Sequence, residues 1–247
     1  MGLKVDTAPR QNPAPAGSNL TYGMLEEVGR TIVTGGYEGR SFPTEAELAK
    51  EHSVSRSVTR EAVKMLTAKG LLTARPRKGT SVQPPSSWNL FDPDVLRWLM
   101  ERKFSLNLLR QFSELRVAIE PMAAALAAAA ADSDEIEAIA AGYRRMEAAE
   151  AGGDDPLEAD IAFHVAILNA SANPFYIQFR DVVATALRTS IQFTNRFKGR
   201  TADLASHRAV LSAIEVRDSD GARATMATII GEVMLLIGEA ERSGKAA

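Results

Sequence analysis

The sequence predicts a mainly α-helical protein in two parts, a small N-terminal module of three helices and a hairpin followed by a larger all-helical domain. Two short runs of strand-forming residues, 71–74 and 80–82, flank a basic loop that ends in Gly79, a pattern typical of a β-hairpin. After Pro93 the apolar residues recur only at helical spacing, and no segment alternates as a strand would. The chain of 247 residues is long enough for two such parts.

The composition excludes several classes of protein. The chain has no cysteine, so disulfides, thiolate metal sites and a cysteine nucleophile are excluded. The longest uninterrupted apolar run, residues 121–131, is too short to span a bilayer. The N-terminus lacks the apolar segment of a signal peptide. We therefore expect a cytoplasmic protein with no membrane partner.

Changes in composition along the chain predict the domain boundaries. We expect a disordered tail over 1–19, the small module over 20–83, a linker over 84–92 that contains Pro84-Pro85-Ser86-Ser87, and the helical domain over 93–243. Within that last domain the spacing and the capping residues predict helices over 93–102, 105–131, 133–151, 156–171, 174–197, 202–217 and 219–242.

Local signals place the helices of the small module. Apolar residues recur at helical spacing from Leu20 to about residue 34. Thr44 and Glu47 form a capping box that starts a second helix, and Ser55 caps a third, which Gly70 ends. Three helices followed by a basic hairpin are typical of a winged helix-turn-helix, with the third helix as the recognition helix.

Charge separates the two parts. Residues 21–82 carry ten Lys/Arg against seven Asp/Glu, a net +3, whereas residues 83–247 carry seventeen against twenty-three, a net −6. Seven of the bases and only one acid lie within 56–78. A basic module on an acidic body favours a nucleic-acid partner, although charge alone fits a solvated basic helix face equally well.

The third helix carries residue types suited to DNA. A recognition helix enters the major groove with its N-terminal residues at the base edges, where arginine forms a bidentate pair with guanine and hydroxyls bond to phosphates or bases. We predict contacts from this helix and from the hairpin tip, where glycine permits close approach of the backbone. The expected DNA-binding residues are Ser55, Arg56, Ser57, Thr59, Arg60, Arg77, Lys78, Gly79 and Thr80.

The amino-acid sequence of this module resembles that of the GntR family of bacterial transcription regulators. The matching segments are 42–45, 48–49, 54–62, Leu66, 70–71 and 76–80, spread over a module of some 60 residues. The resemblance implies that Arg56 and Arg60 read the operator. Some members carry arginine where this chain has Ala46, so operator preference is expected to differ.

Three residues of the helical domain indicate a site. Asp160 and His164 lie four apart on one predicted helix and so share a face, and His207 lies among apolar residues of a later helix. One carboxylate and two imidazoles are a reasonable ligand set for Zn, Ni or Mn. On spacing alone, however, a helical histidine is more often a satisfied core residue.

The same domain resembles the FCD effector domain of FadR-type GntR regulators. The supporting segments are 115–116, 120–121, 160–164, 173–174 and 207–214. The resemblance implies a divalent metal held by one aspartate and three histidines, of which Asp160, His164 and His207 supply three ligands. Ile229 stands where the fourth histidine is expected, so the ligand set is incomplete.

The stretch Trp88–Trp98 narrows the resemblance to the sugar-acid-responsive repressors of the family, whose effectors are hydroxylated acids such as galactonate. Arg116 is then the expected partner of the effector carboxylate, because its guanidinium binds a carboxylate bidentately. Gln192 and Asn195 are expected to face the effector hydroxyls, together with the three metal-ligand residues.

The function expected from these features is that of a homodimeric, sequence-specific repressor that a small carboxylate effector releases from double-stranded operator DNA. The alternatives are a regulator of another organic or fatty acid, a metal-dependent enzyme with a DNA-binding tether, and a structural bundle without a ligand. Against the enzyme, no general acid–base pair and no glycine-rich phosphate loop is apparent in the sequence.

Overall fold

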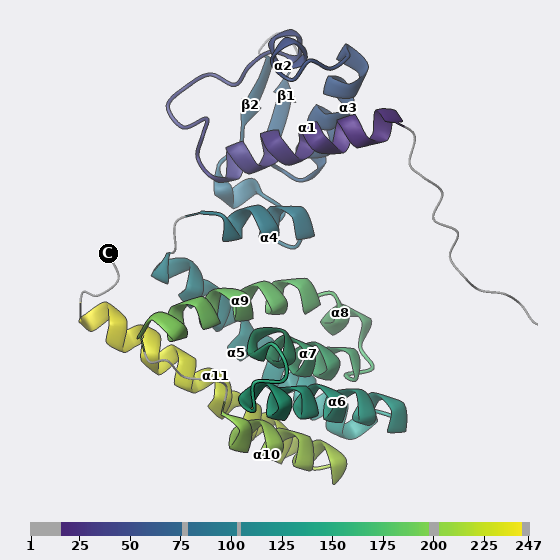
Figure 1. The fold of residues 1–247 in the computed structure, drawn as a ribbon, viewed down its shortest axis with the longest axis vertical. Helices are drawn as coiled ribbons and strands as arrows, with labels where there is room; N and C mark the ends of the chain where they lie inside the picture. The colour runs from purple at the N-terminus through teal and green to yellow at the C-terminus, as the bar shows by residue number, and fades with distance from the viewer. Residues whose placement is uncertain (1–15, 76–78, 103–104, 198–202, 244–247) are drawn as a thin grey trace, which may run out of the picture. The chain divides into compact units, whose positions relative to one another are not determined.

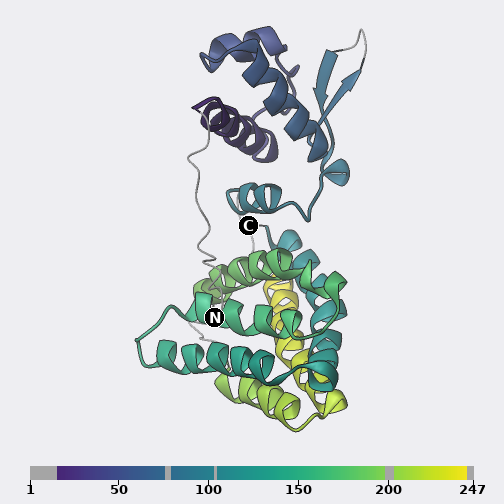
Figure 2. The ribbon, with the colours of Figure 1, turned by 90° about the vertical axis from the view of Figure 1, so that its right-hand side faces the viewer.

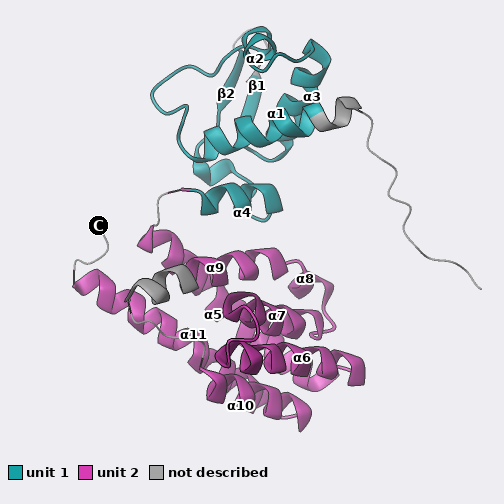
Figure 3. Ribbon diagram, in the orientation of Figure 1, with its two compact units in different colours: residues 1–101 teal, residues 102–247 magenta. Residues whose placement is uncertain are grey.

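The computed structural model describes residues 16–75, 79–102, 105–197 and 203–243. The chain divides into two compact units, residues 1–101 and 102–247 (Figure 3). Helices dominate both units, as expected, and the described strands form one two-stranded antiparallel hairpin. The expected tail over 1–19 lies mostly outside the described residues, which begin with a helix at Ala16.

The first unit has the expected order of three helices and a hairpin (Figure 1). In the hairpin, Leu72 pairs with Val82 and Arg75 with Gly79. Leu48, Leu66 and Leu71 are fully buried in the core of this unit. The elements are α1 (Ala16–Val33), α2 (Glu45–Glu51), α3 (Arg56–Ala68), β1 (Leu72–Arg75) and β2 (Gly79–Val82).

Two predicted caps fix the helix-turn-helix. The hydroxyl of Thr44 accepts a hydrogen bond from the backbone N–H of Glu47, whose carboxylate accepts one from the backbone N–H of Thr44. Ser55 Oγ accepts from the N–H of Val58 at the start of α3. Between the two helices Ser53 has a positive φ of 53°, so this residue reverses the chain. The capping box and the serine cap are therefore confirmed.

Helix α4 (Pro93–Met100) belongs to the first unit, whereas the sequence predicted that the second domain begins at residue 93. Trp98 is fully buried in the core of the first unit, and its ring lies where a side chain at Gly29 of α1 would otherwise be. The ammonium of Lys69 binds Asp92 at the N-terminus of α4 at 2.7 Å. The boundary at 101–102 thus follows from packing across the predicted linker, which includes the short 3₁₀ helix η1 (Pro85–Ser87).

The second unit is an all-helical bundle (Figures 1 and 2). The long helices α5 and α11 pack along each other, α6 packs on α7, and α10 contacts α11. Its helices are α5 (Leu106–Ala130), α6 (Ser133–Glu150), α7 (Pro156–Asn169), α8 (Pro174–Ile177), α9 (Arg180–Phe197), α10 (Leu204–Glu215) and α11 (Ser219–Arg242).

One detail of the bundle differs from expectation. The predicted helix over 174–197 is two helices, α8 and α9, separated at residues 178–179. The cap of α6 is Asp132, which forms a capping box with Glu135. An aspartate side chain satisfies the free N–H groups at this helix start, so Ser133 becomes the first helical residue.

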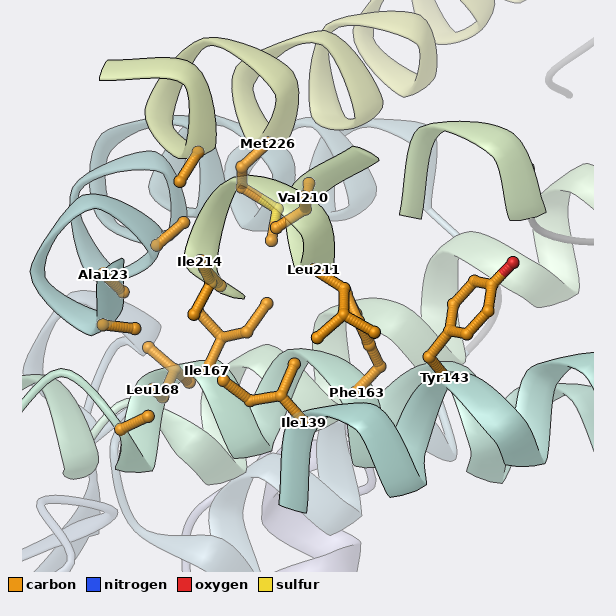
Figure 4. Close-up of a cluster of buried hydrophobic side chains, with 14 of the residues drawn as sticks. Ala123, Ile139, Tyr143, Phe163, Ile167, Leu168, Val210, Leu211, Ile214 and Met226 are labelled. Carbon is orange, nitrogen blue, oxygen red and sulfur yellow. The ribbon is translucent and has the colours of Figure 1, made fainter. Parts of the chain in front are cut away.

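The core of the second unit lies between α5, α6, α7, α10 and α11. Figure 4 shows Ile139, Phe163, Ile167 and Leu211 directed toward one another from three of these helices. Gly142 lets α6 approach α7 closely, because a Cβ at this position would lie 2.8 Å from Phe163 Cα. These buried contacts hold α7 and α10 together, and those two helices carry the three metal-ligand residues expected from the sequence.

Candidate functional site

The N-cap and the exposed face of α3 carry four of the nine predicted DNA-binding residues. Ser55, Arg56, Ser57 and Arg60 are all exposed at or near the N-terminus of this helix. The first N–H groups of a helix favour anions, and the two arginines add positive charge at the same place. This surface is therefore suited to phosphates and to the edges of bases. Arg60 Nε lies 3.6 Å from the carboxylate of Glu45 on α2, an ion pair that the sequence did not predict.

Thr59 does not belong to this face. It is fully buried, and its hydroxyl donates to the backbone carbonyl of Ser55 at 3.2 Å. Its side chain therefore packs in the core of the first unit, and the predicted contact of Thr59 with DNA is wrong for this conformation. The cause is the rotation of α3, which turns the row of Thr59, Ala62, Val63 and Leu66 inward.

The hairpin tip is described in part. Gly79, with a positive φ of 78°, and Thr80 lie at the start of β2, Gly79 exposed and Thr80 half-buried. The left-handed conformation of Gly79 favours glycine, as the tight turn requires. Arg77 and Lys78 lie outside the described residues.

The second unit holds a buried polar cluster. Asp160 and His164 come from α7 and His207 from α10, all three are buried, and their ligand atoms lie within 4.8 Å of one another. His207 Nε2 is 3.1 Å from Asp160 Oδ1 and 3.4 Å from His164 Nε2, and His164 Nε2 is 3.6 Å from the same oxygen. The three residues that the sequence grouped are therefore adjacent in space.

In both histidines the ring nitrogen Nδ1 contacts an oxygen atom outside the cluster. Nδ1 of His207 lies 2.6 Å from the carbonyl oxygen of Asp203, and because a carbonyl only accepts, this nitrogen carries the proton. Nδ1 of His164 lies 2.5 Å from a carboxylate oxygen of Glu120. Both Nε2 lone pairs are then free to face Asp160, the arrangement of histidines that bind metals.

Glu120 also binds Arg116. The guanidinium Nε donates to the second carboxylate oxygen at 2.5 Å, and both side chains are almost completely buried on α5. Arg116 is thus joined to His164 through Glu120. Sequence reasoning missed this role of Glu120; the four-residue spacing from Arg116 on one helix was the available signal.

The charges of the cluster shift its pKa values. Burial opposes ionisation of Glu120, but its electrostatic and hydrogen-bonding interactions with Arg116 and His164 outweigh it and lower its pKa to about 2. Burial likewise opposes ionisation of Asp160, yet the neighbouring histidines hold its pKa below the usual value. For His207, burial disfavours the cation, but contact with Asp160 raises the pKa. The site therefore holds two carboxylates in the ionised form.

The donor set fits a divalent cation. Asp160 Oδ1 is buried and has no well-aligned hydrogen bond among the described residues, so it is a ligand atom without a donor. Two nitrogens bound to one tetrahedral zinc at about 2.1 Å would be about 3.4 Å apart, which matches the separation of the two Nε2 atoms. One carboxylate and two imidazoles with Nδ1 engaged could thus accept Zn, Ni or Mn.

The remaining predicted residues are placed less fully. Gln192 and Asn195 lie on α9, in a stretch whose side chains fall outside the described part of the structure. Ile229 on α11 is half-buried and packs against the apolar core of the second unit. Its side chain cannot ligate a metal, so the three described ligands leave coordination positions for water or an effector.

Comparison with known proteins agrees with this architecture. Residues 25–82 match the model of the gntR family of bacterial regulatory proteins, and residues 111–232 match that of the FCD domain. The uncharacterized HTH-type transcriptional regulator YieP of Escherichia coli is 34% identical over 218 residues, which cover 84% of this chain and 90% of the relative. The galactonate operon transcriptional repressor of the same organism is 33% identical over 217 residues, which cover 86% and 94%.

Solved structures share the fold. The structure of Lar of Listeria monocytogenes aligns with a TM-score of 0.53 at 18% identity, over 93% of this chain and 99% of that one. McbR/YncC of E. coli aligns with a TM-score of 0.51 at 16% identity, over 90% and 98%. The relatives are transcriptional regulators rather than enzymes. With both family models matched in order along one chain, the protein belongs to the gntR family of bacterial DNA-binding transcription regulators and carries an FCD domain.

Proposed function

We propose that this regulator is a cytoplasmic homodimeric repressor of sugar-acid catabolism that a small carboxylate effector releases from its operator. The observation that carries the effector assignment is the buried cluster of Asp160, His164 and His207 beside Arg116. A cluster of buried polar and charged groups suits a small hydroxylated acid, whereas a fatty acyl chain would need a long apolar channel. The likeness to a galactonate operon repressor supports a sugar acid such as galactonate.

DNA recognition is assigned to the exposed start of α3. Arg56 and Arg60 would read base edges in the major groove while the hydroxyls of Ser55 and Ser57 bond to phosphates. The wing residues Arg77, Lys78, Gly79 and Thr80 would contact the backbone or the minor groove. Two such units related by a two-fold axis would match a palindromic operator.

Effector binding is assigned to the second unit. Asp160, His164 and His207 would hold a divalent cation, which as a Lewis acid would bind carboxylate or hydroxyl oxygens of the effector. Glu120 keeps the His164 ring oriented through Nδ1. Arg116 would meet the effector carboxylate with the part of its guanidinium that Glu120 does not use. Gln192 and Asn195 would bond to hydroxyls.

Release of DNA requires that the effector bind one conformation of the dimer more tightly than the other. A conformation of the second unit that misplaces the two recognition helices would lower operator affinity. Because linkage is reciprocal, operator DNA should weaken effector binding by the same factor.

The test is a titration of operator-bound protein with aldonic and uronic acids, with and without a divalent ion. We expect operator affinity to fall about tenfold or more with one of these acids, a coupling of about 1.4 kcal/mol. If no such acid changes the affinity while binding to DNA remains salt-sensitive, the sugar-acid assignment is wrong but DNA binding stands.

Metal binding is tested separately. His207→Ala should abolish retention of a divalent ion measured by elemental analysis, whereas His52→Ala should not. His52 is the matched control because it lies in the first unit and belongs to no predicted metal site. Equal metal content in the two variants would refute the assignment of ligands.

A further inference from the structure

Helix α11 is a long helix with a strongly apolar stretch, and much of it is uncovered. By length and composition it is apolar enough to cross a membrane, yet only 22% of the residues in its most apolar window are buried. Its inner face packs on α5 and α10 through Ala222, Met226, Ile230 and Ile237. The outer face therefore lacks a partner in the described part of the chain.

The outer face is centred on Gly231. At 100° per residue, seven residues fall within about 40° of Gly231 around the helix axis. None of them is buried, and Leu235, the one large apolar residue among them, is 69% exposed. A Cβ at Gly231 would meet no atom within 4 Å. The seven are Asp220, Ala224, Ala227, Gly231, Leu235, Gly238 and Arg242.

The seven residues of one α11 match those of a second α11 that runs in the opposite direction. If a second α11 runs antiparallel with its Gly231 against the first, the residue four places before Gly231 faces the one four places after it. Ala227 then receives the side chain of Leu235. Small residues near the centre allow close approach of the two backbones. At the ends Asp220 faces Arg242, so opposite charges meet twice across a two-fold axis.

A membrane fits this face less well. The flanks of the exposed face carry Glu232 and Glu239 in addition to Asp220, and carboxylates are costly in an apolar phase. The helix also cannot leave the bundle without exposing Met226 and Ile230, which are fully buried. Both observations favour a protein partner.

We propose that the outer face of α11, defined by the seven residues above, binds the same face of a second copy of this chain in an antiparallel arrangement. This inference rests on the homodimer of the proposed function and names its surface. The two-fold axis passes beside Gly231, Leu235 of each copy packs on Ala227 of the other, and Asp220 and Arg242 pair at both ends.

The absence of cysteine permits a direct test on the full chain. Gly231→Cys introduces one thiol beside the proposed axis, where two Cα atoms within about 7 Å allow a disulfide. Ala224→Cys is the matched control, because it is exposed on the same face but its symmetry mate would be about 21 Å away. We expect the first variant to form a covalent dimer at micromolar concentration at least about tenfold faster than the second. Equal rates, or no dimer from Gly231→Cys, would overturn the proposal.

A second measurement does not depend on the thiol. Leu235→Glu should raise the dimer dissociation constant at least about tenfold in sedimentation equilibrium, because it places a carboxylate in an apolar contact on both copies. Phe175→Glu is the control, since Phe175 is 77% exposed on α8. Unchanged dimer affinity in Leu235→Glu would count against this surface.

Two further results distinguish the possible failures. If Leu235→Glu does not fold by circular dichroism, the charge reversals decide: Asp220→Arg should weaken the dimer, and adding Arg242→Asp should restore it. A wild-type chain that stays at 26.6 kDa would refute the homodimer itself, whereas a dimer that Leu235→Glu and the charge reversals leave intact refutes only this surface. Sedimentation with lipid vesicles without self-association would favour a membrane instead.

Discussion

Replacing Glu120 with glutamine tests the buried polar network of the second unit. Glu120 accepts from Arg116 and from His164 and is 1% exposed. Its pKa falls from 4.5 to about 2 because these two groups outweigh the effect of burial. A difference of that size corresponds to about 3 kcal/mol, which agrees with the roughly 3–5 kcal/mol lost when one partner of a buried ion pair is removed.

We therefore expect Glu120→Gln to lower the free energy of unfolding by about 3 kcal/mol at pH 7. The pKa of Glu120 is lowered in the folded state, so its contribution is complete above the unfolded value near 4.5 and is lost as the pH falls toward 2. The difference between wild type and variant should shrink over that interval.

The assay is urea unfolding of the full chain without divalent ions, followed by two signals. Both tryptophans, Trp88 and Trp98, lie in the core of the first unit, so their fluorescence reports that unit. Far-UV circular dichroism reports both units. Glu120→Gln should shift the dichroism transition and leave the fluorescence transition in place. Glu114→Gln, at an exposed position on the same helix, is the control and should change stability by less than about 0.5 kcal/mol.

A variant that matches wild type within about 0.5 kcal/mol at pH 7 would refute the reasoning, because a buried arginine would then have lost its partner without cost. A difference that stays constant from pH 6 to pH 3 would show that packing, rather than the charge of Glu120, is responsible.

Three further predictions concern the first unit. Glu26→Gln should shift the fluorescence transition to lower urea by less than the Glu120 change does, because Glu26 is part-exposed, and the effect should vanish as the pH falls from 4.5 toward its folded pKa of about 2. Gly29→Ala should destabilise the same transition by about 1–3 kcal/mol, since its Cβ would lie 2.3 Å from the ring of Trp98; an unchanged transition would mean that α4 does not pack on α1. Arg56→Ala should cost about 1–3 kcal/mol of operator affinity in a fluorescence-anisotropy titration, whereas Thr59→Val should leave base preference unchanged; a changed preference would contradict the buried position of Thr59.

Local signals in the sequence were sufficient for much of the fold. The capping box of Thr44 and Glu47 acts within one helical turn, so its residue types alone predict where α2 begins. Helical spacing likewise indicated that Asp160 and His164 share a face. The grouping of these two with His207 followed from the residue types and was strengthened by the resemblance, and the structure brings the ligand atoms of all three within 4.8 Å of one another.

Other features depend on contacts between residues far apart in the chain. Glu120 and His164 are 44 residues apart, and no local pattern relates them. Whether Thr59 faces the core or the solvent depends on how α3 is rotated about its axis. Helical spacing alone is compatible with both orientations of this side chain. The boundary of the first unit was misplaced because the contact of Trp98 with Gly29 spans the predicted linker.

The order of the elements, their caps and the chemical types of the ligand residues can be inferred from the chain alone, because these depend on neighbours within a few residues. The partner of each buried polar group, the rotation of the recognition helix and the uncovered face of α11 depend on how the helices pack. Burial changes the energy of a charge or a hydroxyl far more than any local preference does, and burial exists only once distant segments are in contact.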